Sequence, residues 1–331
     1  MSCDVFAVGN ALVDIQARVP DQLVVDLGYP KGGMALVDDT AQQTVLDALA
    51  HAELHRCPGG SAANTVMGVA DFGGTAAYAA KVGDDGLGTF YADDIRRLGV
   101  RFDTAPQAGG QTGTSVILIS PDGERTMCTN LAASSTLGPD DVSAEAIAGA
   151  KMVYVEGYLW PGESTRAAAL RTIELAEEAG VKVAFTVSDP FLIASFREDF
   201  LKLVEGPVDL LFCNLEEARA LTGEDDPVAC AAAIHRHASD VALTLGGDGS
   251  LLMHGGQTFP VEGVPVDVVD TTGAGDMYAA GILYGLTNGL DWPAAGRLAS
   301  HASARVVSQM GARLAEPLSA AEVADLSKAP S

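Results

Sequence analysis

One glycine-rich stretch combines residue types that can bind an anion and move a proton. Residues 270–276 read Asp-Thr-Thr-Gly-Ala-Gly-Asp, and a helical pattern of apolar residues follows them. A helix that starts here directs its free N–H groups and the positive end of its dipole at the turn, so Gly273, Ala274 and Gly275 form an anion site suited to phosphate. A carboxylate at Asp276 would repel bound phosphate unless it has a task there. The task that fits is to accept the proton of a hydroxyl that attacks the phosphorus.

A second carboxylate and an amide lie in the N-terminal part of the chain. Asp14 follows a strand-like run and the pair Gly-Asn, and it stands among apolar residues. A buried carboxylate needs partners, and neighbouring hydroxyls of a sugar would provide two hydrogen bonds; an aspartate in a turn at a strand end is the alternative. Residues 57–64, Cys-Pro-Gly-Gly-Ser-Ala-Ala-Asn, predict a turn into a helix whose small residues allow close approach of a ligand or of another helix. Asn64 is expected one turn into that helix, facing the same space.

Two more polar sequences follow expected strands in the second half of the chain. Asn214 and Glu217 stand three residues apart at an expected helix start, where they share a face. Their oxygens suit Mg²⁺ or the waters around it, and an asparagine cap with a capping-box glutamate explains the same spacing. Residues 244–250, Thr-Leu-Gly-Gly-Asp-Gly-Ser, form another glycine turn after a strand, as a plain hairpin would.

These strings together resemble the signatures of one family. Residues 270–276 resemble the C-terminal signature of the ribokinase-like (PfkB) carbohydrate and nucleoside kinases, and Gly-Gly-Ser-x-x-Asn at 59–64 resembles the other signature. Gly-Asn-x-x-x-Asp at 9–14 resembles the segment whose aspartate holds sugar hydroxyls, and Asn-x-x-Glu at 214–217 resembles the motif that supports magnesium through water. Residues 125–133, Arg-Thr-Met-Cys-Thr-Asn-Leu-Ala-Ala, look like the adenosine kinase branch.

The resemblance implies a reaction, phosphoryl transfer from ATP to a primary hydroxyl. Asp276 would deprotonate that hydroxyl, the N–H groups of 273–275 would stabilise charge on the transferred group, and Mg²⁺, which Glu217 would support through water, would bridge the phosphates. The family pattern also allows a monovalent cation such as K⁺, for which the sequence itself gives no signal. The residues implied to bind the acceptor are Asn10, Leu12, Asp14, Met34, Leu36, Gly59, Gly60, Asn64, Arg125 and Tyr158, and those implied to bind the nucleotide are Asn214, Thr244, Gly246, Gly249 and His301.

Within the acceptor set, polar residues would bind a ribose and apolar ones a base. The ribose set is Asn10, Asp14, Gly60 and Asn64, and the base set is Leu12, Met34, Leu36 and Tyr158. Arg125, on an expected hairpin, would supply a cation when a lid closes. The expected acceptor is therefore a purine nucleoside, most simply adenosine. A ribokinase or fructokinase-type sugar kinase with the same machinery stays open, as does a sensor that binds nucleoside without catalysis.

The elements that must position these residues follow from the hydrophobic pattern. From residue 153 the chain alternates strand-like and helix-like segments, which predicts a parallel sheet flanked by helices, with ligands at the C-terminal ends of its strands. Residues 16–38 appear as irregular structure and residues 40–55 as a helix. By resemblance the fold class is α/β, a single ribokinase-like three-layer sandwich over 1–331 with a mostly parallel central sheet and a small β lid. The expected core is about 1–10, 39–107 and 133–331, and the expected lid is about 11–38 and 108–132.

Composition limits the partners. The 331 residues carry 20 Lys and Arg against 44 Asp and Glu, a net charge of −24, which argues against nucleic acid or an anionic membrane as a partner. The five cysteines are scattered without a Cys-x-x-Cys pair, so neither a disulfide framework nor a zinc site is expected. No basic segment precedes an apolar run near the N-terminus, so we expect a cytoplasmic protein, monomeric or dimeric, whose partners are a nucleoside or sugar and ATP.

Overall fold

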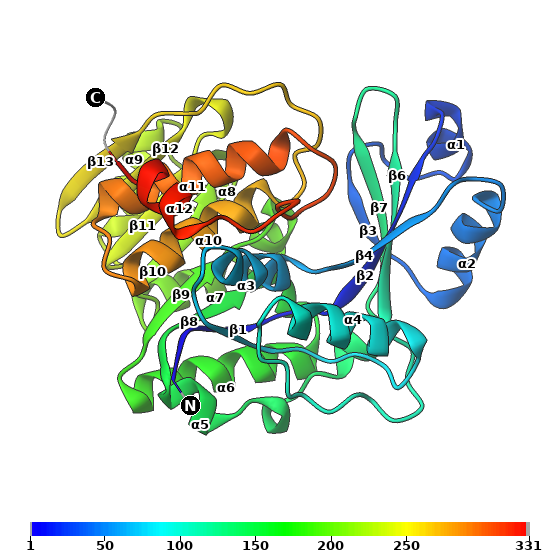
Figure 1. Ribbon diagram of the computed structural model, residues 1–331, viewed down its shortest axis with the longest axis horizontal. Helices are drawn as coiled ribbons and strands as arrows, with labels where there is room; N and C mark the ends of the chain where they lie inside the picture. The colour runs from blue at the N-terminus through cyan, green and yellow to red at the C-terminus, as the bar shows by residue number, and fades with distance from the viewer. Residues whose placement is uncertain (1, 329–331) are drawn as a thin grey trace.

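The computed structural model describes residues 2–328, and two sheets of unequal size organise them (Figure 1). The larger sheet has eight strands in the order β13-β12-β11-β10-β9-β8-β1-β5. Its strands from β11 to β5 are parallel, and β12 and β13 add an antiparallel edge. The strands are β1 Cys3–Val8, β5 Ala76–Ala79, β8 Ala150–Glu156, β9 Lys182–Thr186, β10 Leu210–Asn214, β11 Asp240–Thr244, β12 Ser250–His254 and β13 Gln257–Val261.

Helices cover both faces of the larger sheet because its strands are apolar on both sides. In β1, Val5 and Ala7 belong to one core cluster while Phe6 and Val8 belong to the other, as the two-residue repeat of a strand requires. Helices α3, α10 and α11 pack on the first face, and α5, α6, α8 and α9 pack on the second. The α-helices are α1 Asp21–Asp26, α2 Asp39–Ala48, α3 Ser61–Asp71, α4 Gly86–Arg97, α5 Ala144–Ala148, α6 Glu163–Ala179, α7 Pro190–Glu205, α8 Leu215–Thr222, α9 Pro227–His235, α10 Ala274–Thr287, α11 Trp292–Val307 and α12 Ala320–Leu326.

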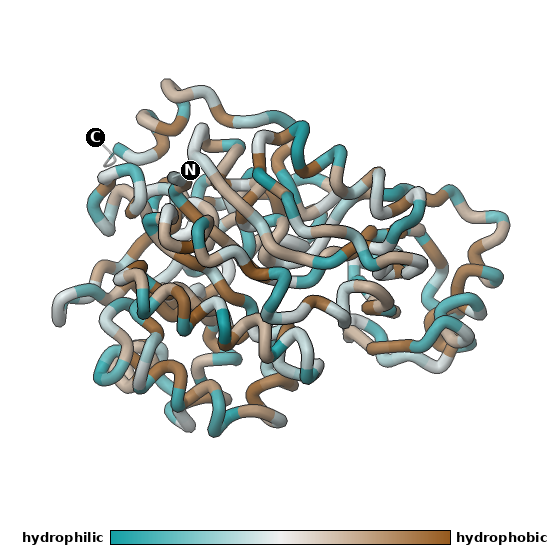
Figure 2. Tube along the Cα trace, turned by 90° about the horizontal axis from the view of Figure 1, so that it is seen from below, coloured by the Kyte–Doolittle hydropathy of each residue, from teal (hydrophilic) through white to brown (hydrophobic). Residues whose placement is uncertain are grey.

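The smaller sheet stands at one end of the molecule (Figure 2). Its order is β3-β7-β6-β2-β4, and its strands are β2 Leu12–Arg18, β3 Met34–Leu36, β4 His55–Gly59, β6 Gly113–Ile119 and β7 Arg125–Asn130. One face packs on α1 and α2 through a separate small core that includes Ile15 and Val116. The next residues along the same strands, such as Asp14 and Ser115, point to the opposite face, toward the larger body.

The alternating second half and the α/β three-layer architecture are confirmed, but three expectations in the N-terminal part are wrong. The helix expected over 40–55 ends at Ala48, and His55 begins β4. Because β4 pairs with β2, residues 55–59 belong to the smaller sheet, and α2 packs on that sheet too, so the expected core segment from 39 to 59 is misassigned. A short helix, α1, also interrupts the segment expected to be irregular.

A further difference concerns the approach to the glycine-rich turn. The last strand of the larger sheet, β13, ends at Val261, and residues 262–269 belong to no helix or strand. The glycine-rich turn therefore does not lie at the end of a sheet strand. Val268 in that segment is 64% exposed and lines a cavity rather than a core. Within residues 2–328, none of the helices has the length and apolar character that a membrane span requires.

Candidate active site

A cavity of about 740 Å³ separates the two sheets. The C-terminal ends of the parallel strands, the inner face of the smaller sheet and the first turn of α10 enclose it. Most residues expected to do chemistry meet there, although they are distributed over the whole chain. They are Asn10, Leu12, Asp14, Met34, Leu36, Gly60, Asn64, Arg125, Tyr158, Asn214, Glu217, Thr244, Gly273, Gly275 and Asp276.

The glycine-rich turn has the geometry of an anion site. Gly273 is the N-cap of α10 with φ +75°, and a Cβ there would come 2.4 Å from the carbonyl oxygen of Ala312, so only glycine fits. Among residues 2–328 no side chain caps this helix start, which leaves its positive end directed at the cavity. Gly275 lines the cavity with open space where a Cβ would be, so a ligand can reach the backbone. The N–H of Ala274 donates instead to the carbonyl of Thr271 at 3.3 Å.

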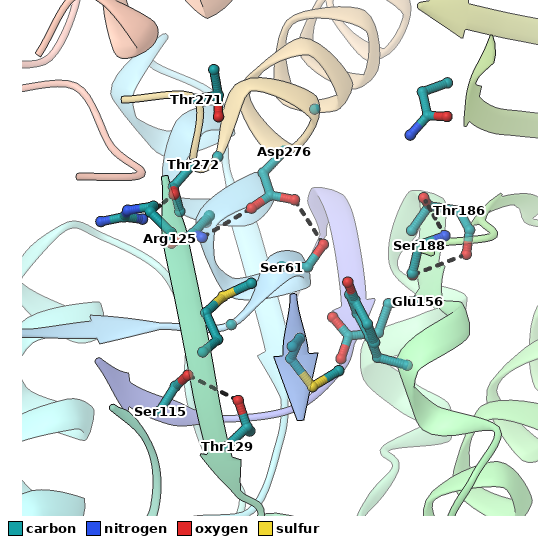
Figure 3. A pocket seen from close by; sticks show the side chains of 18 of the residues that line it. Ser61, Ser115, Arg125, Thr129, Glu156, Thr186, Ser188, Thr271, Thr272 and Asp276 are labelled. Atoms are coloured by element: carbon teal, nitrogen blue, oxygen red, sulfur yellow. Dashed lines mark hydrogen bonds between the residues drawn. The ribbon is translucent and has the colours of Figure 1, made fainter. Parts of the chain in front are cut away.

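Asp276 is held in place by two donors from α3. Ser61 Oγ donates to its Oδ1 at 2.7 Å and Asn64 Nδ2 donates to its Oδ2 at 2.9 Å (Figure 3). Burial raises the pKa of Asp276 to about 6, and the two hydrogen bonds oppose that rise because they favour the carboxylate. The carboxyl group is therefore ionised at neutral pH. Its pKa lies close enough to neutral pH for the group to take up and release a proton. Asn64 Oδ1 is buried and lacks a hydrogen-bond partner within the described part of the chain, which leaves it available to a ligand hydroxyl.

A buried glutamate at the end of β8, Glu156, hydrogen-bonds to the segment after β1 and to the start of α3. Glu156 Oε1 accepts from the backbone N–H and the side-chain amide of Asn10, at 2.7 and 2.9 Å, and its Oε2 accepts from the N–H of Ala62 at 2.8 Å. Ser134 Oγ donates to Asn10 Oδ1 at 2.9 Å. The side chain of Asn10 is thus engaged by the protein itself. Its position in the cavity is as expected, but its amide organises the loop rather than standing free to bind ribose.

Asp14 lies on the inner face of the smaller sheet, in contact with the turn before α3. Burial raises its pKa to about 7, while the nearby guanidinium groups of Arg125 and Arg313 oppose the rise. A Cβ on Gly59 would come 2.6 Å from an Asp14 carboxylate oxygen, so Gly59 leaves room for this side chain without lining the cavity itself. Gly60 has φ +107°, and a Cβ there would meet the carbonyl oxygen of Asn10 at 2.1 Å. Close packing therefore requires both glycines, Gly59 against the carboxylate of Asp14 and Gly60 against the backbone of Asn10.

Arg125 reaches from the smaller sheet to the glycine-rich turn. Its guanidinium forms a buried ion pair with Asp270, with Nη2 and Oδ2 3.1 Å apart, and it donates to Thr272 Oγ1 (Figure 3). Asp270 also accepts from the N–H of Thr272 at 2.9 Å and from the N–H of Gly311 at 2.8 Å. The expected cation is therefore beside the anion site already, and its charge is balanced by a carboxylate of the same turn.

Asn214 and Glu217 adopt the capping arrangement and line the cavity as well. The N–H and the amide of Asn214 donate to the two oxygens of Glu217 at 2.9 and 2.8 Å, and the N–H of Glu217 donates to Asn214 Oδ1 at 2.9 Å. Burial raises the pKa of Glu217 to about 7. Within residues 2–328, no three acidic, histidine or cysteine side chains gather into a metal cage. These residues suit Mg²⁺ that keeps most of its waters better than direct ligation.

Three of the residues expected at the nucleotide lie away from this cavity. Gly249 lies in the turn between β11 and β12 with φ +96°, and a Cβ there would come 2.0 Å from the carbonyl oxygen of Val261, so the turn and its packing on the end of β13 explain the glycine. Gly246 follows β11 with φ +61° and open space around it, and His301 is half-buried on α11. Their proposed roles stay predictions. Thr244, at the end of β11, does line the cavity.

Sequence reasoning missed three polar residues that hold the site. Ser61 stands inside the string at 59–64 and Asp270 inside the string at 270–276, so the motifs contained the signal without indicating the contact. Glu156 ends an apolar strand, where a lone carboxylate is a signal for a site at the strand end.

This fold and site are those of a kinase for small hydroxyl compounds. The model of the pfkB family carbohydrate kinases matches residues 34–318, so the chain belongs to that family, whose members transfer a phosphoryl group to a hydroxyl.

Similar proteins with different acceptors in their names share this architecture. The adenosine kinase from Sinorhizobium meliloti is 38% identical, with a TM-score of 0.92 over 98% of this chain and 99% of that one. A probable sugar kinase from Rhizobium etli is also 38% identical, with a TM-score of 0.93 over 98% and 100%. The 5-dehydro-2-deoxygluconokinase of Geobacillus thermodenitrificans is 31% identical over 76% of this chain and 78% of that protein. These names leave the acceptor of this chain open between nucleoside and sugar.

Proposed function

We propose that this kinase transfers the γ-phosphoryl group of ATP to the 5′-hydroxyl of a purine nucleoside, with adenosine the best acceptor. One observation carries the proposal. The cavity that holds Asp276 and Asp14 is lined on its smaller-sheet side by apolar side chains, among them Leu12, Met34 and Leu36, and Leu36 is 49% exposed. Exposed apolar surface inside a polar site suits a flat base better than a solvated sugar. The adenosine kinase at 38% identity supports the same acceptor.

The geometry of the site supports the following roles for its residues. Asp276, oriented by Ser61 and Asn64, accepts the proton of the attacking hydroxyl. The N–H groups of Gly273 and Gly275, at the positive end of α10, stabilise the charge that develops on the transferred oxygens. Asp14 and Asn64 Oδ1 bind ribose hydroxyls, which fixes the 5′-hydroxyl relative to Asp276. Bound ATP supplies the electrophilic phosphoryl group, and Mg²⁺ would be supported through water by Glu217.

The energetic argument separates nucleoside from free sugar. Burial of roughly 100 Å² of base surface is worth about 2.5 kcal/mol at 25 cal/mol per Å². That energy corresponds to roughly a 70-fold gain in affinity or kcat/KM, which a bare ribose cannot obtain. Adenosine should therefore be phosphorylated with a kcat/KM tens of times that of ribose.

A panel of nucleosides and sugars with ATP tests the proposal. ADP release is measured with adenosine, inosine, ribose, fructose and 5-dehydro-2-deoxygluconate, together with the melting temperature at equal ligand concentrations. Tyr158→Ala should lower kcat/KM for adenosine and leave kcat/KM for ribose nearly unchanged, because Tyr158 lines the cavity at the end expected for the base. Val25→Ala is the matched control, since Val25 is 66% exposed on α1. A free sugar that proves the better acceptor refutes the nucleoside proposal and supports a sugar kinase, which the gluconokinase relative favours.

A further inference from the structure

The inner face of the smaller sheet carries a polar row, and the side chains that line the cavity on either side of this row are apolar. Asp14 on β2 is in register with Ser115 on β6, and Ser115 is in register with Thr129 on β7. Side chains in register on neighbouring strands point to the same face, and all three line the cavity. Two residues along in one direction, Ile117 is in register with Met127, and both line the cavity, whereas the third member of that row, Gln16, does not line it. In the other direction Leu12 and Leu131 line the cavity.

Ser115 and Thr129 form a hydrogen-bonded hydroxyl pair within this row. Their oxygens are 2.9 Å apart, and either can donate to the other (Figure 3). Ser115 is 4% exposed and Thr129 is 6% exposed, so the pair is nearly withdrawn from solvent. Among residues 2–328 neither hydroxyl has another hydrogen-bond partner. The two hydroxyls carry two protons, and one of these forms the hydrogen bond between them. One O–H and several lone pairs therefore remain for a ligand in the cavity.

The position of the pair relates it to the acceptor. Neighbouring strands lie about 4.8 Å apart, so Ser115 and Thr129 stand roughly one and two strand spacings from Asp14 along the row. A nucleoside whose ribose hydroxyls bind Asp14 extends its base over this row, with its faces against the apolar residues on either side. The polar edge of the base then meets the hydroxyl pair, which can donate to a ring nitrogen and accept from an amino group at once.

We propose that Ser115 and Thr129 determine specificity by recognising the amino-substituted edge of the acceptor's base. This inference rests on the proposed function, because it requires a base in the cavity. A neutral hydrogen bond contributes enough to change kcat/KM about three- to tenfold. The wild-type enzyme should therefore prefer adenosine to purine riboside, which lacks the amino group, by about that factor.

The test compares adenosine with purine riboside in wild type and four variants. Thr129→Val and Ser115→Ala each remove one hydroxyl. Each should lower kcat/KM for adenosine and so bring the ratio of the two kcat/KM values close to one. Thr129→Ser keeps the hydroxyl and should keep the wild-type ratio. Thr114→Val is the matched control, because its hydroxyl lies on the opposite face and bonds to Gln42 Oε1 at 2.7 Å.

The outcomes separate this inference from the proposed function. An unchanged ratio in both Thr129→Val and Ser115→Ala overturns it, and the pair would then only stabilise the sheet. Equal loss in Thr114→Val and Thr129→Val also overturns it, since the effect would come from a weakened sheet. The proposed function is judged on the wild-type enzyme alone. If wild type accepts sugars and no nucleoside, both fail, whereas turnover of both nucleosides at equal rates by wild type refutes only the role of the pair.

Discussion

Ser61→Ala should change the pH dependence of the reaction in a calculable way. Ser61 Oγ donates to Asp276 Oδ1 at 2.7 Å, and this bond stabilises the carboxylate, whose pKa burial raises to about 6. A hydrogen bond to a charged group is worth about 1.5–3 kcal/mol, and one pKa unit corresponds to 1.36 kcal/mol. Loss of the bond should therefore raise the pKa of Asp276 by roughly 1–2 units, to about 7–8.

The sign follows from the role of the carboxylate. A base acts only when it is ionised, so kcat/KM is full above the pKa of Asp276 and falls as the pH falls through it. For wild type this decline is centred near pH 6. With the pKa raised to about 7.5, the ionised fraction of the variant at pH 6.5 is roughly eightfold lower, while at pH 9 the two enzymes are nearly equal in this respect.

The measurement is kcat/KM from pH 5 to 9.5, by release of ADP. Ser61 is the first residue of α3, where alanine is a good helix former, so the fold should survive. Ser61→Thr keeps the hydroxyl and serves as control. A variant whose profile is lower by the same factor at every pH would refute the reasoning. The acidic limb would then belong to another group, such as Asp14 or Glu156, whose pKa values burial raises to about 7 and to which the Ser61 hydroxyl does not donate.

Three further predictions address other parts of the site. Asp276→Asn should lower kcat about 10²–10⁴-fold while the acceptor still raises the melting temperature; a variant that retains a tenth of wild-type kcat is not missing its base. Asp14→Ala should lower kcat/KM for adenosine much more than kcat/KM for 2′-deoxyadenosine. Equal losses would mean that Asp14 does not bind the 2′-hydroxyl. Asp270→Asn should lower the free energy of unfolding by about 3–5 kcal/mol in urea, because it removes the charge of the ion-pair partner of the buried Arg125. Glu174→Gln, which breaks an exposed ion pair, should change it by under about 1 kcal/mol.

The sequence predicted the fold well where contacts are local and poorly where they are not. The alternation after residue 153 shows in short apolar runs and helix starts, and β8 to β12 appear there as expected. The placement of β4 depends on pairing with β2, and Pro58 argues against a strand at that point. The proline is tolerated because β4 is the edge strand of the smaller sheet.

The candidate site shows the same limit at the level of atoms. The resemblance of the motifs to family signatures led us to expect Asp276, Asp14 and Asn64 in one site, and the structure brings the three to one cavity, while their roles stay predictions. The motifs could not indicate that the amide of Asn10 turns to Glu156, since the two are 146 residues apart. Contacts of this kind arise only when β1 and β8 lie side by side in the sheet.

The carboxylate of Asp270 has a consequence for how the binding of one ligand affects the binding of the other. It joins the arginine of the smaller sheet, the backbone of the anion-binding turn and the loop at Gly311 in one set of contacts. A phosphate that binds Arg125 must alter the contacts of Arg125 with the glycine-rich turn. The same contacts fix the position of the smaller sheet, which carries Asp14 and the wall of the acceptor cavity. Binding of the donor and binding of the acceptor therefore share a free-energy term, and by reciprocity each changes the affinity of the other by the same factor.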